Sequence, residues 1–99
     1  MFHHIVLMRF GNEADQAFHA KVEAFADAIR DASPRPLRYI YRRNTAARSG
    51  GLDWAIVSAF RSSAEHDAYQ ASPLHQEMKA FMTPCIMELV ACDLDEAGQ

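Results

Sequence analysis

A histidine placed just after a serine–proline pair is the side chain best positioned for chemistry in this sequence. Ser72 suits the N-cap of a helix and Pro73 its first position, which makes His75 the third helical residue. The positive end of a helix dipole disfavours imidazolium, so we expect a His75 pKa below about 6.5 and a neutral ring near pH 7. A neutral imidazole accepts a proton as a general base does. On spacing alone, an ordinary surface residue at a helix start is the simpler interpretation.

The other histidines and one tyrosine give less specific signals. His3 and His4 are adjacent in an apolar strand, so they point to opposite faces of a sheet, and each by itself is interpreted as a structural histidine. Tyr69 precedes the helix break and is interpreted as core lining with its hydroxyl at the boundary. His19 and His66 lie among polar neighbours on helices, and we expect both at the surface.

The sequence contains no pattern typical of a binding site for a metal ion or an organic cofactor. It lacks a glycine-rich phosphate loop, a nucleophile elbow, a paired-carboxylate motif and an H-E-x-x-H helix. No spacing supports a zinc site that combines His4 and His75 with a third ligand, and Cys85 and Cys92 lack metal-ligand spacing. We therefore expect no metal and no cofactor, two reduced thiols, and Cys92 in the core.

Size and charge narrow the classes of partner. The 99 residues form one domain, 1–99, and their net charge of −3 argues against nucleic acid. Five arginines lie within fourteen positions (Arg35, Arg38, Arg42, Arg43 and Arg48) and form either a solvated edge or a rim that attracts an anionic small molecule. No apolar run reaches the roughly 20 residues that span a bilayer, and the start of the chain does not resemble a signal peptide, so we expect a cytoplasmic protein without membrane contact.

Hydrophobic periodicity predicts the order β-α-β-β-α-β. The expected strands are 2–10, 37–43, 52–61 and 86–94, and the expected helices are 13–31 and 62–71, the second restarting at Ser72-Pro73 and ending at Pro84. This is the ferredoxin-like α+β arrangement, an antiparallel four-stranded sheet with its helices on one face.

Three of these strands, 2–10, 52–61 and 86–94, are apolar on both faces. A half-solvated antiparallel sheet would alternate apolar with polar residues, so the face without helices needs a cover. A second copy of the sheet is the simplest cover and gives a dimeric α+β barrel. We therefore expect a homodimer, with Trp54 and Phe60 buried.

Three segments of the chain resemble the stress-responsive A/B barrel domain family. They are H-I-V-L-M-R-F (4–10), G-L-D-W-A-I-V-S-A-F (51–60) and A-Y-Q-A-S-P-L-H (68–75), the last similar to the family element Y-x-x-h-P-x-H. Ser72 stands where many members have histidine, and Phe18 and Phe25 occupy the helix that carries a further pocket tyrosine in one member. The resemblance covers residues 3–94 and implies a ferredoxin-like homodimer.

The family includes plant stress-associated proteins and a polyketide cyclase that catalyses an aldol condensation without a metal or organic cofactor. The resemblance therefore implies a site at His4, Tyr69 and His75, with His75 as general base and the other two orienting substrate oxygen atoms. Three functions remain open: an enzyme or binder for a small, partly apolar carbonyl compound, a non-catalytic dimeric stability module, and a cofactor-free monooxygenase. A cavity beside His75 would favour the first, and a site filled by phenylalanine and methionine side chains the second.

Overall fold

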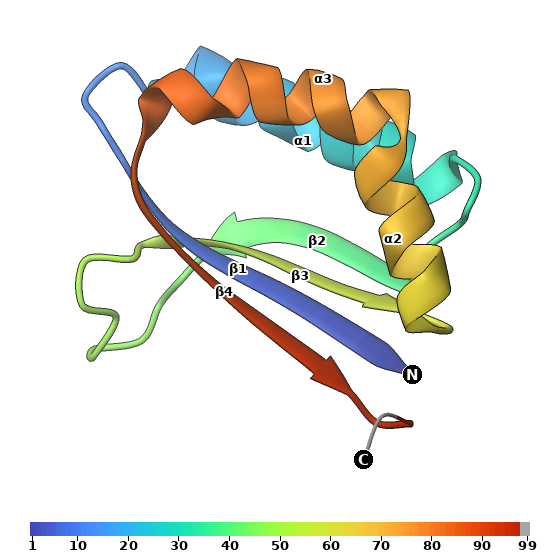
Figure 1. Cartoon of the computed structure of the whole chain (residues 1–99). Coiled ribbons are helices and arrows are strands. Elements are labelled where there is room, and N and C mark those ends of the chain that lie inside the picture. The colour runs from blue at the N-terminus through green and yellow to red at the C-terminus, as the bar shows by residue number, and fades with distance from the viewer. Residues whose placement is uncertain (98–99) are drawn as a thin grey trace.

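The computed structural model describes residues 1–97 and contains a four-stranded antiparallel sheet with three α-helices on one face (Figure 1). The elements are β1 (Phe2–Phe10), α1 (Gln16–Asp31), β2 (Arg38–Arg43), β3 (Trp54–Phe60), α2 (Ser63–Ala71), α3 (Pro73–Met82), the 3₁₀ helix η1 (Thr83–Cys85) and β4 (Ile86–Asp95). The strand order is β2-β3-β1-β4. The predicted ferredoxin-like fold is confirmed. None of the helices within residues 1–97 is long and apolar enough to cross a membrane.

Helix α1 begins at Gln16, later than the expected residue 13, because its N-cap fixes the start. The Asp15 carboxylate accepts the backbone N–H of Phe18 at 2.9 Å and so satisfies one of the free amides of the first turn. Residues on one side of the helix are then buried against the sheet and α3: Phe18, Val22, Ala26 and Ile29.

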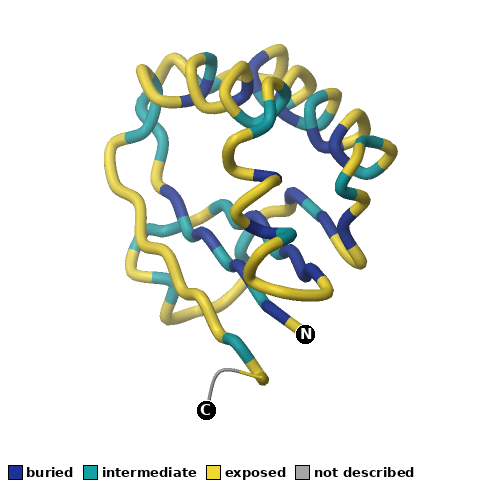
Figure 2. The backbone as a smooth tube through the Cα atoms, turned by 45° about the vertical axis from the view of Figure 1, so that its right-hand side comes forward, coloured by how far each residue is buried: buried dark blue, intermediate teal, exposed yellow. Residues whose placement is uncertain are grey.

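The hydrophobic core lies between the helices and the central strands, as the dark stretches of Figure 2 show. Phe60 and Val22 are 0% exposed. Trp54 was also expected to be buried but is only partly so, because it lies at the start of β3, where its ring packs against Tyr41 and His19.

The opposite face of the sheet carries an apolar surface that none of the helices within the described residues covers. The β1–β4 register pairs Ile5 with Cys92 and Leu7 with Val90 on this face. Val90 is 46% exposed and Leu94 is 55% exposed. Cys92 is exposed as well. Its predicted place in the core is therefore wrong for the single chain, because β4 is an edge strand and this residue points away from the helices.

Truncation of Phe60 should show how far the fold depends on this core. Phe60→Ala should lower the free energy of unfolding by about 3–5 kcal/mol, since the cavity left behind cannot collapse fully. Leu37→Ala, at a residue that is 47% exposed, is the control and should change it by less than about 0.5 kcal/mol. Denaturant unfolding followed by circular dichroism measures both, and equal small losses would contradict this description of the core.

Candidate functional site

The break between α2 and α3 brings two of the predicted site residues together. Ser72 ends α2 by donating its N–H and its hydroxyl to the carbonyl of Tyr69, at 3.0 and 2.6 Å. The same hydroxyl oxygen accepts the backbone N–H of His75 at 3.3 Å and begins α3, as the sequence predicts. The turn places the rings of Tyr69 and His75 edge to face, with centroids 4.7 Å apart.

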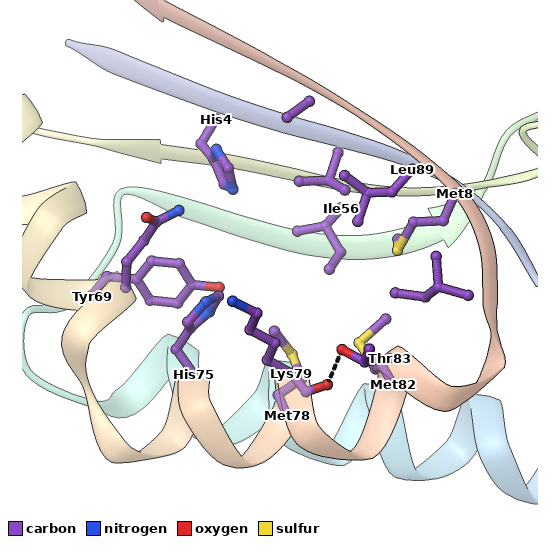
Figure 3. A pocket seen from close by; sticks show the side chains of 14 residues that line it. His4, Met8, Ile56, Tyr69, His75, Met78, Lys79, Met82, Thr83 and Leu89 are labelled. Atoms are coloured by element: carbon purple, nitrogen blue, oxygen red, sulfur yellow. Dashed lines mark hydrogen bonds between the residues drawn. The ribbon is translucent and has the colours of Figure 1, made fainter.

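A cavity of about 250 Å³ lies between α3 and the sheet (Figure 3). All three predicted site residues, His4, Tyr69 and His75, line it, together with the ammonium-bearing side chain of Lys79. Most of the remaining wall is apolar and comes from Val6, Met8, Ile56, Met78, Met82 and Leu89. Few polar groups in a mostly apolar cavity are typical of small-molecule sites, where they fix the orientation of the ligand.

His4 enters the cavity from β1 with its ring held by a carboxylate. It is 7% exposed, and the register pairs it with Asp93 on β4. Its Nδ1 lies 2.5 Å from Oδ1 of Asp93. A carboxylate only accepts hydrogen bonds, so Nδ1–H of His4 is the donor, and Nε2 is the ring nitrogen that Asp93 does not engage.

His75 is neutral at physiological pH in this environment. Burial, together with electrostatic repulsion from Lys79, His4 and His66, lowers the pKa of His75 to about 4. The direction agrees with the sequence expectation, although burial is the largest cause. Among the described residues, Nδ1 of His75 is buried and has no hydrogen-bond partner. A ligand that offers a donor or acceptor to this nitrogen would therefore supply a missing hydrogen bond.

Tyr69 contributes a protonated hydroxyl. Burial raises the pKa of Tyr69 to about 12, and its hydroxyl lies 2.7 Å from that of Tyr39. Tyr69 is 3% exposed, as expected for a residue that lines the core. The phenol can thus hydrogen-bond a substrate oxygen but does not ionise near pH 7.

The prediction of a surface position for His66 is wrong. His66 is 4% exposed, and its ring stacks on Phe2 with centroids 4.7 Å apart and packs against Phe60 and His4. Burial and the charge of His4 lower the pKa of His66. Its spacing of three from Tyr69 is the signal that was available, since residues three apart share one face of a helix.

A second cluster of aromatic and basic side chains lies around the start of β3. His19 was expected at the surface but is partly buried, stacks 4.0 Å from Trp54 and shares a 2.8 Å hydrogen bond with the Tyr41 hydroxyl. Arg43 lies over the Trp54 ring. The five arginines between residues 35 and 48 do not line the cavity between α3 and the sheet. They are Arg35, Arg38, Arg42, Arg43 and Arg48.

Sequence reasoning missed two further residues of the site. Lys79 follows His75 by four residues, a spacing that places both side chains on one face of α3, so the sequence held a signal for it. Asp93 is 89 residues from His4 along the chain, and only the β1–β4 register brings the two together. A one-residue change of register would have pointed its side chain to the other face.

Comparisons with known proteins agree with this fold. The pattern of the family described as Stress Responsive A/B Barrel Domain matches residues 2–96. A dimeric ferredoxin-like protein of unknown function from Thermobifida fusca superposes with a TM-score of 0.81 at 22% identity, covering 95% of this chain and 89% of that chain. The hydroxynitrile lyase from Passiflora edulis gives a TM-score of 0.84 at 19% identity, covering 99% and 94%.

An antibiotic biosynthesis monooxygenase-like protein from Nitrosomonas europaea gives a TM-score of 0.79 at 10% identity, covering 95% of this chain and 96% of that chain. At such identities these structures show the fold alone. No curated protein matches the sequence.

The low pKa of His75 predicts how stability depends on pH. The folded protein keeps this ring neutral down to a pKa of about 4, whereas the unfolded chain protonates it near 6.5. The unfolded state therefore binds more protons as the pH falls through 6.5, and the free energy of unfolding should decrease until the pH passes about 4. Thermal unfolding from pH 7.5 to 4 measures this.

His75→Gln is the matched variant because it removes this titration but keeps a polar side chain. Its free energy of unfolding should decrease less between pH 7.5 and pH 4 than that of the wild type. Identical pH profiles, or a wild-type ring that titrates near 6.5 by NMR, would contradict the burial of His75.

Proposed function

The chain belongs to the stress responsive A/B barrel domain family, and from that premise we propose that it binds a small, mostly apolar carbonyl compound and catalyses proton transfer on it without an organic cofactor. The observation that carries this proposal is the cavity of about 250 Å³ in which His4, Tyr69 and His75 line an otherwise largely apolar wall. Packed phenylalanine and methionine side chains would have left no such space.

His75 is the proposed general base, and its neighbours are arranged to stabilise the anion that forms. Removal of a proton next to a carbonyl gives an enolate, whose oxygen needs a hydrogen-bond donor or a cation. Tyr69 supplies a phenolic O–H and Lys79 an ammonium group in the same cavity. His4, held by Asp93, orients the substrate through its Nε2.

A histidine with a pKa of about 4 is always in the base form near pH 7, yet it is a weak base. The bound substrate changes this, because a developing enolate beside the ring stabilises imidazolium and raises its pKa. Proton transfer to His75 is thus favoured only when the anion forms, which limits reaction to a correctly placed substrate.

A non-catalytic dimeric stability module is the alternative. It is supported by the hydrogen bond of His4 to Asp93, which joins β1 to β4, and by the packing of His66 against Phe2 and Phe60. These contacts stabilise the sheet whether or not a ligand binds. The fold shared with a monooxygenase-like protein leaves oxygenation as a third candidate, but no feature of the cavity favours it.

The proposed assembly is a homodimer in the cytoplasm. The apolar open face of the sheet, with Val90 and Leu94 about half exposed, supports a second copy as its cover. Cys85 and Cys92 are free thiols, a state that the reducing cytoplasm maintains.

Deuterium exchange tests the proposed proton transfer directly. The wild-type protein, stripped of metal and kept in chelator, should accelerate exchange of the methyl protons of acetophenone in deuterated buffer, measured by NMR. His75→Gln should reduce this acceleration by about 10²–10⁴-fold, since it removes the base but keeps a polar side chain. The variant should remain folded, with a free energy of unfolding within about 1 kcal/mol of wild type.

Gln76→Ala is the control, because Gln76 is an exposed neighbour that does not line the cavity. It should keep the wild-type rate. If the wild-type protein exchanges no faster than buffer and no carbonyl compound raises its melting temperature, the catalytic proposal fails and the stability module is favoured.

Light scattering tests the dimer. The wild-type protein should have twice the 11.1 kDa mass of the chain at micromolar concentration, since an interface between sheets of this kind buries about 2,000 Å² or more. Val90→Asp should shift it to the monomer, because the change places a charge on the apolar face. Ala68→Asp, on the exposed side of α2, should remain dimeric. A wild-type monomer would overturn the proposed assembly.

A further inference from the structure

Two histidines and an aspartate form a compact cluster at one end of the sheet. His4, His66 and Asp93 each place a potential ligand atom within 4.8 Å of the others. They come from three elements, β1, α2 and β4, so the tertiary fold alone creates the group. Two imidazoles and one carboxylate are a ligand set that first-row transition metal ions favour.

A polar atom of this cluster has no hydrogen-bond partner within residues 1–97. Nε2 of His66 is buried and makes no hydrogen bond to the described residues, although the ring is 4% exposed and firmly packed. Buried polar groups in folded proteins nearly always have a partner, so this nitrogen calls for one. The aromatic contacts of the ring with Phe2 and Phe60 explain its packing but leave this atom unsatisfied.

We propose that His4, His66 and Asp93 bind a divalent transition metal ion of the zinc class. Coordination would give the free nitrogen of His66 a partner, and the Asp93 carboxylate would balance part of the charge of the ion. Hard ions such as Mg²⁺ and Ca²⁺ prefer sites made mainly of oxygen ligands, so the two imidazoles select against them.

The geometry requires only a local adjustment. Nitrogen and oxygen ligands at about 2.0–2.2 Å from a tetrahedral zinc ion lie roughly 3.4 Å apart. His4 and His66 are nearly buried, with ring centroids 4.4 Å apart, whereas the Asp93 side chain is 47% exposed on an edge strand. Rotation of this carboxylate from its present contact with Nδ1 of His4 would complete the site.

Three protein ligands leave one position of a tetrahedral ion open, as in catalytic zinc sites. His4 also lines the cavity between α3 and the sheet, so the ion would lie next to the space proposed for the carbonyl ligand. This site does not depend on the proposed proton transfer, which is assayed in chelator. Failure of one proposal therefore leaves the other standing.

Cobalt titration of the untagged, metal-stripped full chain tests the site. We expect one Co²⁺ per chain with the strong visible absorption of four-coordinate cobalt, and displacement of the cobalt by Zn²⁺. Asp93→Asn and His66→Phe should each weaken Co²⁺ binding at least about 10-fold, the smallest loss typical of changes around a metal site. Phenylalanine preserves the ring packing of position 66, and circular dichroism verifies that both variants fold.

His3→Gln is the matched control. His3 is adjacent to His4, lies on the other face of the sheet and is also paired with a carboxylate, that of Glu96, but it belongs to no three-residue cluster among the described residues. Its removal should change the Co²⁺ affinity by less than about twofold. The proposal is overturned if wild-type protein binds Co²⁺ no more tightly than His66→Phe, or if His3→Gln weakens binding as much as Asp93→Asn.

Discussion

The capping interactions of Ser72 determine where the polar groups of the cavity lie. A continuous helix from Ser63 to Met82 would be about 30 Å long, and all its residues would follow one straight axis. The Ser72 hydroxyl instead donates to the Tyr69 carbonyl of α2 and accepts the His75 amide of α3, and Pro73 prevents continuation of the helix. As a result α2 turns toward the end of the sheet while α3 lies along it (Figure 1), and the space between α3 and β1 remains open.

The parts of the structure that depend on local signals were predictable from the sequence, and those that depend on long-range contacts were not. The apolar runs of β1 and β3, and the serine–proline pair at the helix break, are local signals, and each element formed within a few residues of its expected bounds. The burial of His66 was missed because its neighbours in sequence are polar, whereas its neighbours in space are Phe2 and Phe60. The partner of His4 was missed because strand register is a long-range property.

The close packing of three imidazoles has an electrostatic consequence. Burial lowers the pKa values of His66 and His75, and electrostatic repulsion from the neighbouring His4 acts in the same direction on both. Asp93 is the carboxylate that contacts this group, through His4. The lowered pKa values of His75 and His66 favour their neutral rings, which a general base and a metal ligand both require.

Strand β4 links the cavity to the proposed dimer. Leu89 lines the cavity and is nevertheless 49% exposed, because β4 is an edge strand and no helix lies directly over it. Its neighbour Val90 points to the open face and is exposed to a similar extent. Movement of β4 therefore changes the cavity wall and the open face of the sheet together, because the side chains of a strand alternate between its two faces. A partner sheet that holds Val90 and Leu94 in place would also hold Leu89 and Asp93, and with them the wall of the cavity and the carboxylate that orients His4. The association of two chains and the geometry of the site are therefore coupled through β4.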